Sequence, residues 1–252
     1  MRFSPIFMAC HPWRPPFWPS LRDVKNCSRQ FFCAALLPWL AGCQVFSDKP
    51  SSATVPETRL QGELSLQAGQ LHFRPCQEQR RFVISDDGNS GISREAAELL
   101  ADGASSLFAD LRGSLKASEQ AGVDGKFSPS LVYRLQTQGA GCSDINFKRT
   151  SLHASGQEPG WSVAVNRQGL VLNRQGLEPQ ALPYLEEQLP EGRLHLSSEA
   201  NGQRLELWVA PQRCVDSLSG TVQHLSAELR LNGEVLRGCA YLGGARGGAR
   251  DL

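Results

Sequence analysis

Motifs for metal, phosphate or nucleic-acid chemistry are absent from this chain. The spacings C-x-x-C and H-x-x-x-H, which are typical of zinc and copper sites, do not occur. Neither the phosphate-binding pattern G-x-x-x-x-G-K-[ST] nor the nucleophile elbow G-x-S-x-G is present. Basic residues stand singly or at most in pairs, without the interleaved aromatic residues of a nucleic-acid-binding surface. We therefore predict no metal, no cofactor and no nucleic-acid partner.

Acid–base groups arranged for hydrolysis are also lacking. The histidines that follow the N-terminal segment stand alone in sequence: His72, His153, His195 and His224. Glu186 and Glu187 are adjacent, so their side chains point apart rather than converge on a glycosidic bond. We predict no catalytic residue. A pocket in which His195 or His224 meets a carboxylate and a hydroxyl would instead indicate a hydrolase.

Long apolar runs are scarce, and the most informative one lies near the N-terminus. Residues 31–40 are too few to span a bilayer, and Pro38 interrupts them. The run follows Lys25 and precedes the tetrapeptide Leu-Ala-Gly-Cys, which ends at Cys43. A basic start, a short apolar run and small residues at the cut make an export signal. Because the tetrapeptide matches a bacterial lipobox, we predict cleavage before Cys43 and fatty acylation of that cysteine.

The flanks of this signal predict the start of the chain and its address. Residues 1–23 mix prolines with aromatic residues and have no periodicity, so we expect Val24 to be the true start within a signal segment of residues 1–42. Residues 43–58 are rich in Pro, Ser and Thr and predict a flexible tether. Gln44, rather than Asp, follows the lipidated cysteine. In lipoproteins of similar layout this indicates the outer membrane, with the body facing the periplasm.

The predicted mature chain keeps four cysteines besides the lipidated one and carries three more acidic than basic residues. An even number of cysteines in an exported protein indicates disulfides. Four cysteines allow three pairings. A division of the chain into two domains favours Cys76–Cys142 and Cys214–Cys239, whose loops contribute roughly 4 and 3.5 kcal/mol on the chain-entropy model.

Alternating apolar residues predict two small, mainly β domains. In the first, residues 59–149, alternation along residues 60–66 indicates a strand, and Ser93 looks like the N-cap of a helix. Apolar residues at roughly helical spacing continue to Leu111, and residues 131–135 read as a further strand. One helix among short strands predicts a small antiparallel barrel or curled sheet.

The second predicted domain, residues 152–242, is built from strands alone. Its clearest signal is Asn232-Gly233 between two alternating runs, because a type I′ hairpin turn needs positive φ at both positions. Residues 178–191 carry prolines and predict loops, and the Gly-rich residues 243–252 are expected to be disordered.

The second domain resembles an uncharacterised family of Gram-negative envelope lipoproteins over residues 154–243. The resemblance rests on Glu-Pro-Gly-Trp-Ser at 158–162, Cys-Val-Asp-Ser at 214–217, Gly220, Ala227, Asn232-Gly233 and Arg-Gly-Cys-Ala at 237–240. More distantly, this domain is similar to META/HslJ-type β domains, and the first domain to the N-terminal barrel of NlpE-type lipoproteins. Cys76 does not begin the C-x-x-C of the NlpE pattern, so no copper role is carried over. The resemblance implies an envelope address and no established activity.

We therefore expect a non-enzymatic binding or structural role in the envelope, with another protein, peptidoglycan or a small ligand as partner and the membrane held through Cys43. Trp161 and Asp216 are candidate residues of a ligand groove. The alternatives are that Trp161 plugs a barrel end and that Asp216 caps a turn. A second hypothesis is a periplasmic inhibitor of lysozyme-type enzymes, and a third is a periplasmic hydrolase.

Overall fold

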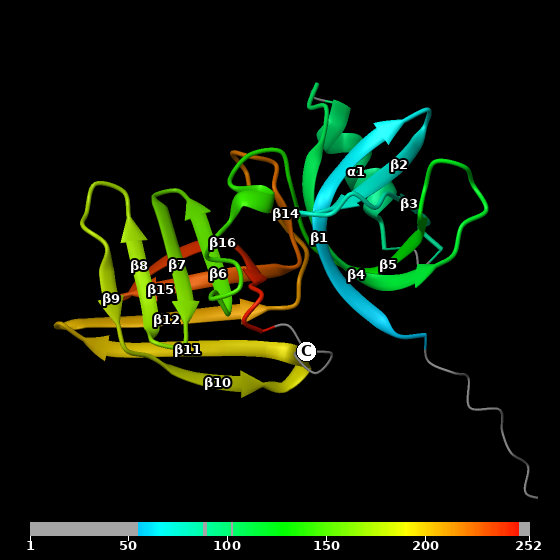
Figure 1. The fold of residues 1–252 in the computed structure, drawn as a ribbon. Coiled ribbons are helices and arrows are strands. Elements are labelled where there is room, and N and C mark those ends of the chain that lie inside the picture. Colours follow the sequence, from blue (N-terminus) through cyan, green and yellow to red (C-terminus); the bar gives the residue numbers. More distant parts are fainter. Residues whose placement is uncertain (1–54, 88–89, 102, 247–252) are drawn as a thin grey trace, which may run out of the picture. The chain divides into compact units, whose positions relative to one another are not determined.

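Five strands in the N-terminal half of the computed structural model close into a barrel (Figure 1). The structure describes residues 55–87, 90–101 and 103–246. The barrel consists of β1 (Glu57–Gln67), β2 (Gln70–Pro75), β3 (Phe82–Ile84), β4 (Leu107–Lys116) and β5 (Gly125–Gln136), and α1 (Ile92–Ala101) lies between β3 and β4 in sequence. The strand order is β1-β2-β3-β5-β4 and back to β1, with only β3 and β5 parallel. This is the five-stranded Greek-key layout of OB-fold barrels, and a layout alone assigns no function.

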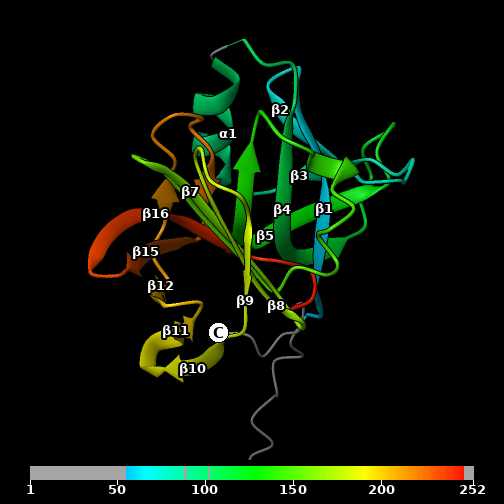
Figure 2. The ribbon, with the colours of Figure 1, turned by 90° about the vertical axis from the view of Figure 1, so that its left-hand side faces the viewer.

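Alternation along the strands fills the barrel with apolar side chains. Leu64 on β1 and Phe73 on β2 point inward, and the Phe73 ring stacks on Phe127 with 5.6 Å between centroids. Helix α1 turns its apolar stripe to the same core, to which it contributes Ile92, Ala96 and Leu99. Figure 2 shows α1 at one end of the barrel. The barrel core is thus closed by the helix.

Nine strands of the C-terminal half form a second sheet, which curls without closing. It consists of β6 (Leu152–Gln157), β7 (Gly160–Asn166), β8 (Gly169–Arg174), β9 (Gln180–Leu182), β10 (Leu185–Leu189), β11 (Arg193–Ala200), β12 (Gln203–Ala210), β15 (Leu225–Leu231) and β16 (Glu234–Leu242). All of its pairs are antiparallel, β16 returns to pair with β6, and the free edges are β9 and β10. Leu196, Leu207 and Leu229 are buried on its inner face.

Two short strands from the C-terminal half join the barrel sheet instead. β13 (Cys214–Val215) pairs with β14 (Val222–Gln223), and β14 pairs with β5 of the barrel. A buried ion pair makes a second junction, because Arg59 on β1 binds Asp110 on β4 and donates to the carbonyl of Leu242 at 2.5 Å. The described residues belong to one compact unit.

The structure confirms the predicted fold class, mainly β with one helix, a barrel and a curled sheet. The strands of the barrel and of the curled sheet lie in separate stretches of the chain, except that β13 and β14 pair with the barrel sheet. The division into two domains stays a prediction. Asn232 and Gly233 have φ of 51° and 92°, as the predicted hairpin turn requires. Both disulfides are the predicted ones, Cys76–Cys142 and Cys214–Cys239, each with 5.4 Å between Cα atoms.

Several predicted boundaries were wrong. The helix ends at Ala101 and Leu107 already belongs to β4, because the apolar residues that continue its spacing are buried strand positions. Glu186 and Glu187 lie in β10 rather than in a loop. β1 starts at Glu57, two residues inside the predicted tether. Residues 243–246 are not free, since their backbone bonds to Phe147, Thr150 and Ser151.

The signal segment, Cys43 and residues 247–252 lie outside the described residues. Within the described ranges, no helix has the length and hydropathy needed to cross a membrane. A short 3₁₀ turn, η1 (Gly141–Ser143), carries Cys142, and a second, η2 (Pro190–Gly192), links β10 to β11. These turns complete the regular structure described.

Candidate functional site

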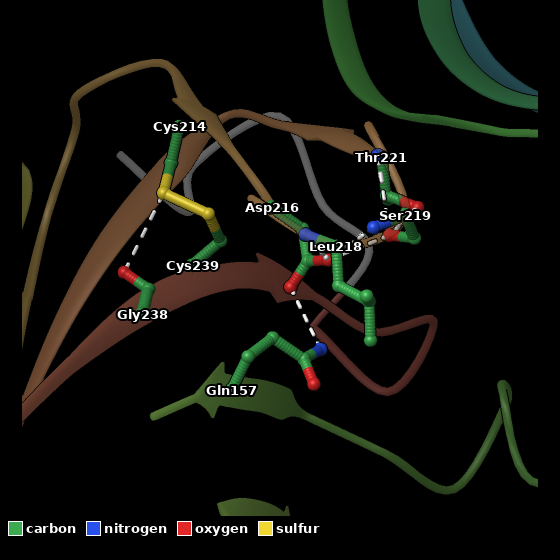
Figure 3. Close-up of a disulfide and its surroundings, with 8 residues drawn as sticks. All are labelled: Gln157, Cys214, Asp216, Leu218, Ser219, Thr221, Gly238 and Cys239. Carbon is green, nitrogen blue, oxygen red and sulfur yellow. Dashed lines mark hydrogen bonds between the residues drawn. A yellow bond between two sulfur atoms is a disulfide. The ribbon is translucent and has the colours of Figure 1, made fainter. Parts of the chain in front are cut away.

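The residues between β12 and β15, 211–224, leave the second sheet, reach the barrel and return. We call them the crossing segment. Three side-chain links hold it in place: the disulfide from Cys214 to Cys239 on β16, an ion pair from Arg213 to the buried Glu95 on α1, and a hydrogen bond from Gln157 to Asp216. Figure 3 shows the first and the last of these links side by side. The crossing segment is therefore fixed to both sheets and to α1, and it forms one wall of the groove described below.

Asp216 organises the turn at the far end of this wall. One carboxylate oxygen accepts from the backbone N–H of Leu218 at 3.1 Å and of Ser219 at 2.8 Å, and the other accepts from Gln157 at 2.9 Å (Figure 3). Gly220 has φ of 68°, which favours glycine at that position. Burial alone would raise the pKa of Asp216, but these hydrogen bonds outweigh it and the net pKa lies below its ordinary value. Asp216 is thus a charged turn cap.

A groove of about 680 Å³ lies between the crossing segment and the outer face of β12, β15 and β16. Trp208 and Arg230 line its floor, Arg237 lies on β16, and Arg193 comes from the start of β11. This volume is in the range of ligand-binding clefts, about 300–1,000 Å³. Asp216 lines the groove from the wall side.

Charge in the groove is unevenly shared. Glu228 binds Arg230 at 2.8 Å and lies 3.6 Å from Arg237, so one carboxylate serves two guanidinium groups. The Trp208 ring lies 5.7 Å from the Arg230 guanidinium, and His195 stacks on its indole with 4.0 Å between centroids. Trp208 is thus fixed in position beside Arg230, in a lining that holds three arginines and the carboxylates of Glu228 and Asp216.

The two residues predicted for a groove lie in different places. Asp216 lines the groove, as described above. Trp161 is 4% exposed and packs in the core of the second sheet, close to Gly156 on β6. Trp161 is therefore a core residue that fills the inside of the curled sheet, and it does not line the groove. That Asp216 contacts a ligand stays a prediction.

Among the described histidines, His195 lines a pocket with Glu187, Ser197 and Ser198, and neither His195 nor His224 is hydrogen-bonded to a hydroxyl group. His195 Nδ1 lies 3.0 Å from a carboxylate oxygen of Glu187, but its buried Nε2 has no hydrogen-bond partner. His224 donates through Nδ1 to the carbonyl of Tyr133 at 3.0 Å, and burial lowers the pKa of its imidazole to about 4. Burial and then the charge of Arg134 lower the pKa of His153, also to about 4. In residues 55–87, 90–101 and 103–246, no group of three His, Cys, Asp or Glu side chains could hold a metal ion.

Trp208, Arg230 and Arg237 are groove residues that the sequence reasoning missed. A signal for Trp208 was present, because Leu205, Leu207 and Val209 alternate inward and place Trp208 on the opposite, outer face. A large aromatic residue on the outward, polar face of a strand indicates a binding surface, whereas an inward one indicates only the core. No sequence signal places the crossing segment over it.

No family model, curated protein or solved structure matches this chain. The site is therefore interpreted from its own geometry.

Proposed function

We propose that this chain is a lipid-anchored binding module of the bacterial envelope, which offers its groove to a partner protein. The observation that carries the proposal is the groove itself, in which Trp208 is fixed beside Arg230 and Arg237, these two arginines share Glu228, and a disulfide holds the wall. Tryptophan and arginine dominate the energetic centres of protein interfaces. A preorganised wall lowers the ordering cost of binding.

The address rests on Cys43 and draws support from the two disulfides, which are typical of oxidising compartments such as the periplasm. With an acylated Cys43, the parent chain should be found in the membrane fraction as a processed form. A Cys43→Ala variant should lose both the processing and the lipid-dependent retention. Normal processing of that variant, with undiminished retention, would contradict the anchor.

The occupant that fits best is an extended protein segment with carboxylates beside an apolar side chain. Arg230 and Arg237 share one glutamate, so an acidic partner would complete the charge pairing. On the wall beside them, Val215 lines the groove and is 45% exposed, so it offers apolar contact area next to the charged floor.

Site-specific photocrosslinking in intact envelopes tests this proposal. A photoreactive residue at Val215, on the groove wall, should give one discrete adduct with an envelope protein. The same residue at Leu66, a similarly exposed apolar position on β1, should not. The adduct at Val215 should disappear in a Trp208→Ala background. No adduct at Val215, the same adduct from both positions, or attachment to glycan alone would overturn the proposal.

A further inference from the structure

A second, smaller pocket lies on the other side of the Gln157–Asp216 hydrogen bond. Its volume is about 170 Å³, and nearly every side chain around it is polar. It lies between β5 and β14 of the barrel sheet and β6 and β16 of the second sheet, and its polar lining includes Arg134, Gln136, His153, Ser155, Gln223 and Tyr241. A polar enclosure of this kind within a β protein needs an explanation, because buried polar groups are costly unless they are paired.

Arg134 on β5 is the central group of this pocket. It is 5% exposed and lies between two aromatic rings, with its guanidinium carbon 4.0 Å from the Tyr241 centroid and 4.8 Å from that of Phe108. Its Nε and Nη2 atoms are buried and have no hydrogen-bond partner. Among the ion pairs of the described residues, none includes Arg134. An unpaired buried charge is destabilising, so the site calls for an anion.

Arg59 shows within the same molecule what this guanidinium edge binds. Arg59 uses Nε and Nη2 to hold both carboxylate oxygens of Asp110, at 2.8 and 2.7 Å. The pair of nitrogens left without partners on Arg134 is the same pair. It forms the side fork that matches the two oxygens of a carboxylate.

Three carboxylates of the described residues act near this pocket, and each already accepts hydrogen bonds. Asp144, whose charge acts on His153 and Tyr241, accepts from the backbone N–H of Asn146 at 2.9 Å. Asp110 faces Arg134 across the β4–β5 ladder, but its oxygens accept from Arg59 and Gln61. Asp216 also lines the pocket, and its carboxylate oxygens accept hydrogen bonds from Gln157 and from the backbone N–H groups of its own turn. The fork of Arg134 is therefore left for a group from outside the chain.

Two acceptors complete the pocket. Gln223 Oε1 and His153 Nδ1 are buried without a hydrogen-bond partner, and His153 is uncharged at neutral pH because burial lowers its pKa to about 4. They can accept from an N–H group next to the carboxylate. The negative charge of Asp216 disfavours a doubly charged anion such as phosphate in the same space.

We propose that the pocket around Arg134 binds the free carboxyl end of a peptide or an N-acylated amino acid, with Arg134 on the carboxylate and Gln223 on the adjoining N–H. This site is distinct from the groove and does not rest on the function proposed for it. Its polar lining suits a carboxyl group together with the adjoining amide.

Side-chain NMR of the full chain, labelled with ¹⁵N-arginine and purified in detergent, tests this assignment. The probe is N-acetylglycine, with N-acetylglycinamide as its uncharged match and inorganic phosphate as the alternative anion. One arginine Nε–H signal should shift saturably with N-acetylglycine. It should not shift with the amide, and phosphate should act at least tenfold more weakly.

Variants identify the site. Arg134→Lys keeps the charge but removes the fork, and should weaken binding about tenfold or more. Ser155→Val fills the pocket from β6 with a strand-compatible side chain and should block binding while Arg134 is intact. Arg230→Gln, in the groove, should leave the titration unchanged. No saturable shift in the parent chain, an equal response to the amide or to phosphate, or full binding by a folded Ser155→Val variant would overturn the assignment.

Discussion

His224 and His153 are held uncharged inside the structure. Burial lowers the pKa of each imidazole to about 4, compared with about 6.5 in an unfolded chain. For His224, the hydrogen bond to the Tyr133 carbonyl opposes this effect without reversing it. Between these pKa values the unfolded chain binds more protons than the folded one, so the free energy of unfolding rises with pH in this window.

We predict that acidification from pH 7.5 to pH 5 lowers the free energy of unfolding by about 2 kcal/mol for each of these two histidines. The loss begins near pH 6.5 and is complete near pH 4. Urea unfolding as a function of pH measures it. A folded His153→Gln/His224→Gln variant should have a flatter pH dependence by about 4 kcal/mol over the same range, while His72→Gln on β2 controls for the substitution. Equal slopes for the double variant and the parent would contradict the burial account.

At this scale, the sequence shows which residues carry chemistry but not where they meet. The even number of cysteines and the division of the chain into two domains predicted both disulfides. Arg134 was invisible, because nothing in a strand of alternating residues distinguishes a buried arginine with a free fork from a surface one. Trp161 attracted attention beside a proline turn, yet its place in strand β7 makes it a core residue.

At the scale of elements, strand β6 needs a glycine at position 156, because the backbone of β16 and the Trp161 ring both approach it closely. A Cβ atom at Gly156 would lie 2.3 Å from the carbonyl oxygen of Arg237 and 2.5 Å from Trp161 Nε1. At Gly160 the nearest atom would be the flexible Gln175 side chain, at 3.4 Å. A Cβ atom at Gly156 would clash with the β16 backbone and with a packed indole, and neither can move away without a loss of stability.

Gly156→Ala should therefore lower the free energy of unfolding by about 1–3 kcal/mol or more, and Gly160→Ala by much less. Denaturant titration of the two variants gives the comparison. Equal stability of both would show that β6 and β16 can separate to admit the methyl group, against the packing described.

The crossing segment depends on its disulfide. Replacing Cys214 and Cys239 with serine should cost up to roughly 3.5 kcal/mol and also weaken partner binding, because the wall of the groove is released. Replacing Cys76 and Cys142 removes a longer loop constraint, up to roughly 4 kcal/mol, but lies away from the groove. Unfolding and crosslinking at Val215 should both be followed. Undiminished crosslinking in the first folded variant would show that the wall needs no such tie.

Element by element, local periodicity worked where the pattern was two-residue alternation and failed where two patterns overlapped. The hairpin at Asn232-Gly233 needs only local turn chemistry, so it was predictable. Leu107, Phe108 and Leu111 continue the helical spacing of α1 by coincidence. Leu107 and Leu111 belong to the barrel core, whereas Phe108 is buried outside it, against Gly141 and Arg134. Ordering of residues 243–246 comes from contacts with residues 147–151, which lie about one hundred residues away in sequence.

For the whole molecule, the fold class followed from the sequence and the closure did not. The parallel pairing of β3 with β5 and the passage of β13 and β14 into the barrel sheet are long-range pairings with no local signature. The resemblance to envelope lipoproteins, the lipid at Cys43 and the outer-membrane address stay predictions. The groove exists only because of the crossing segment, so the candidate site emerged from the structure.

The most direct test of the binding-module account is the affinity of the full chain for a synthetic peptide that spans the partner segment crosslinked at Val215. We predict that Trp208→Ala weakens this affinity about 30-fold or more, which corresponds to about 2 kcal/mol. Neutralising the acidic residues of the peptide should weaken it as well, whereas Leu66→Ala should not. An affinity that is unchanged by Trp208→Ala in a folded protein would contradict the claim that the groove is the binding site.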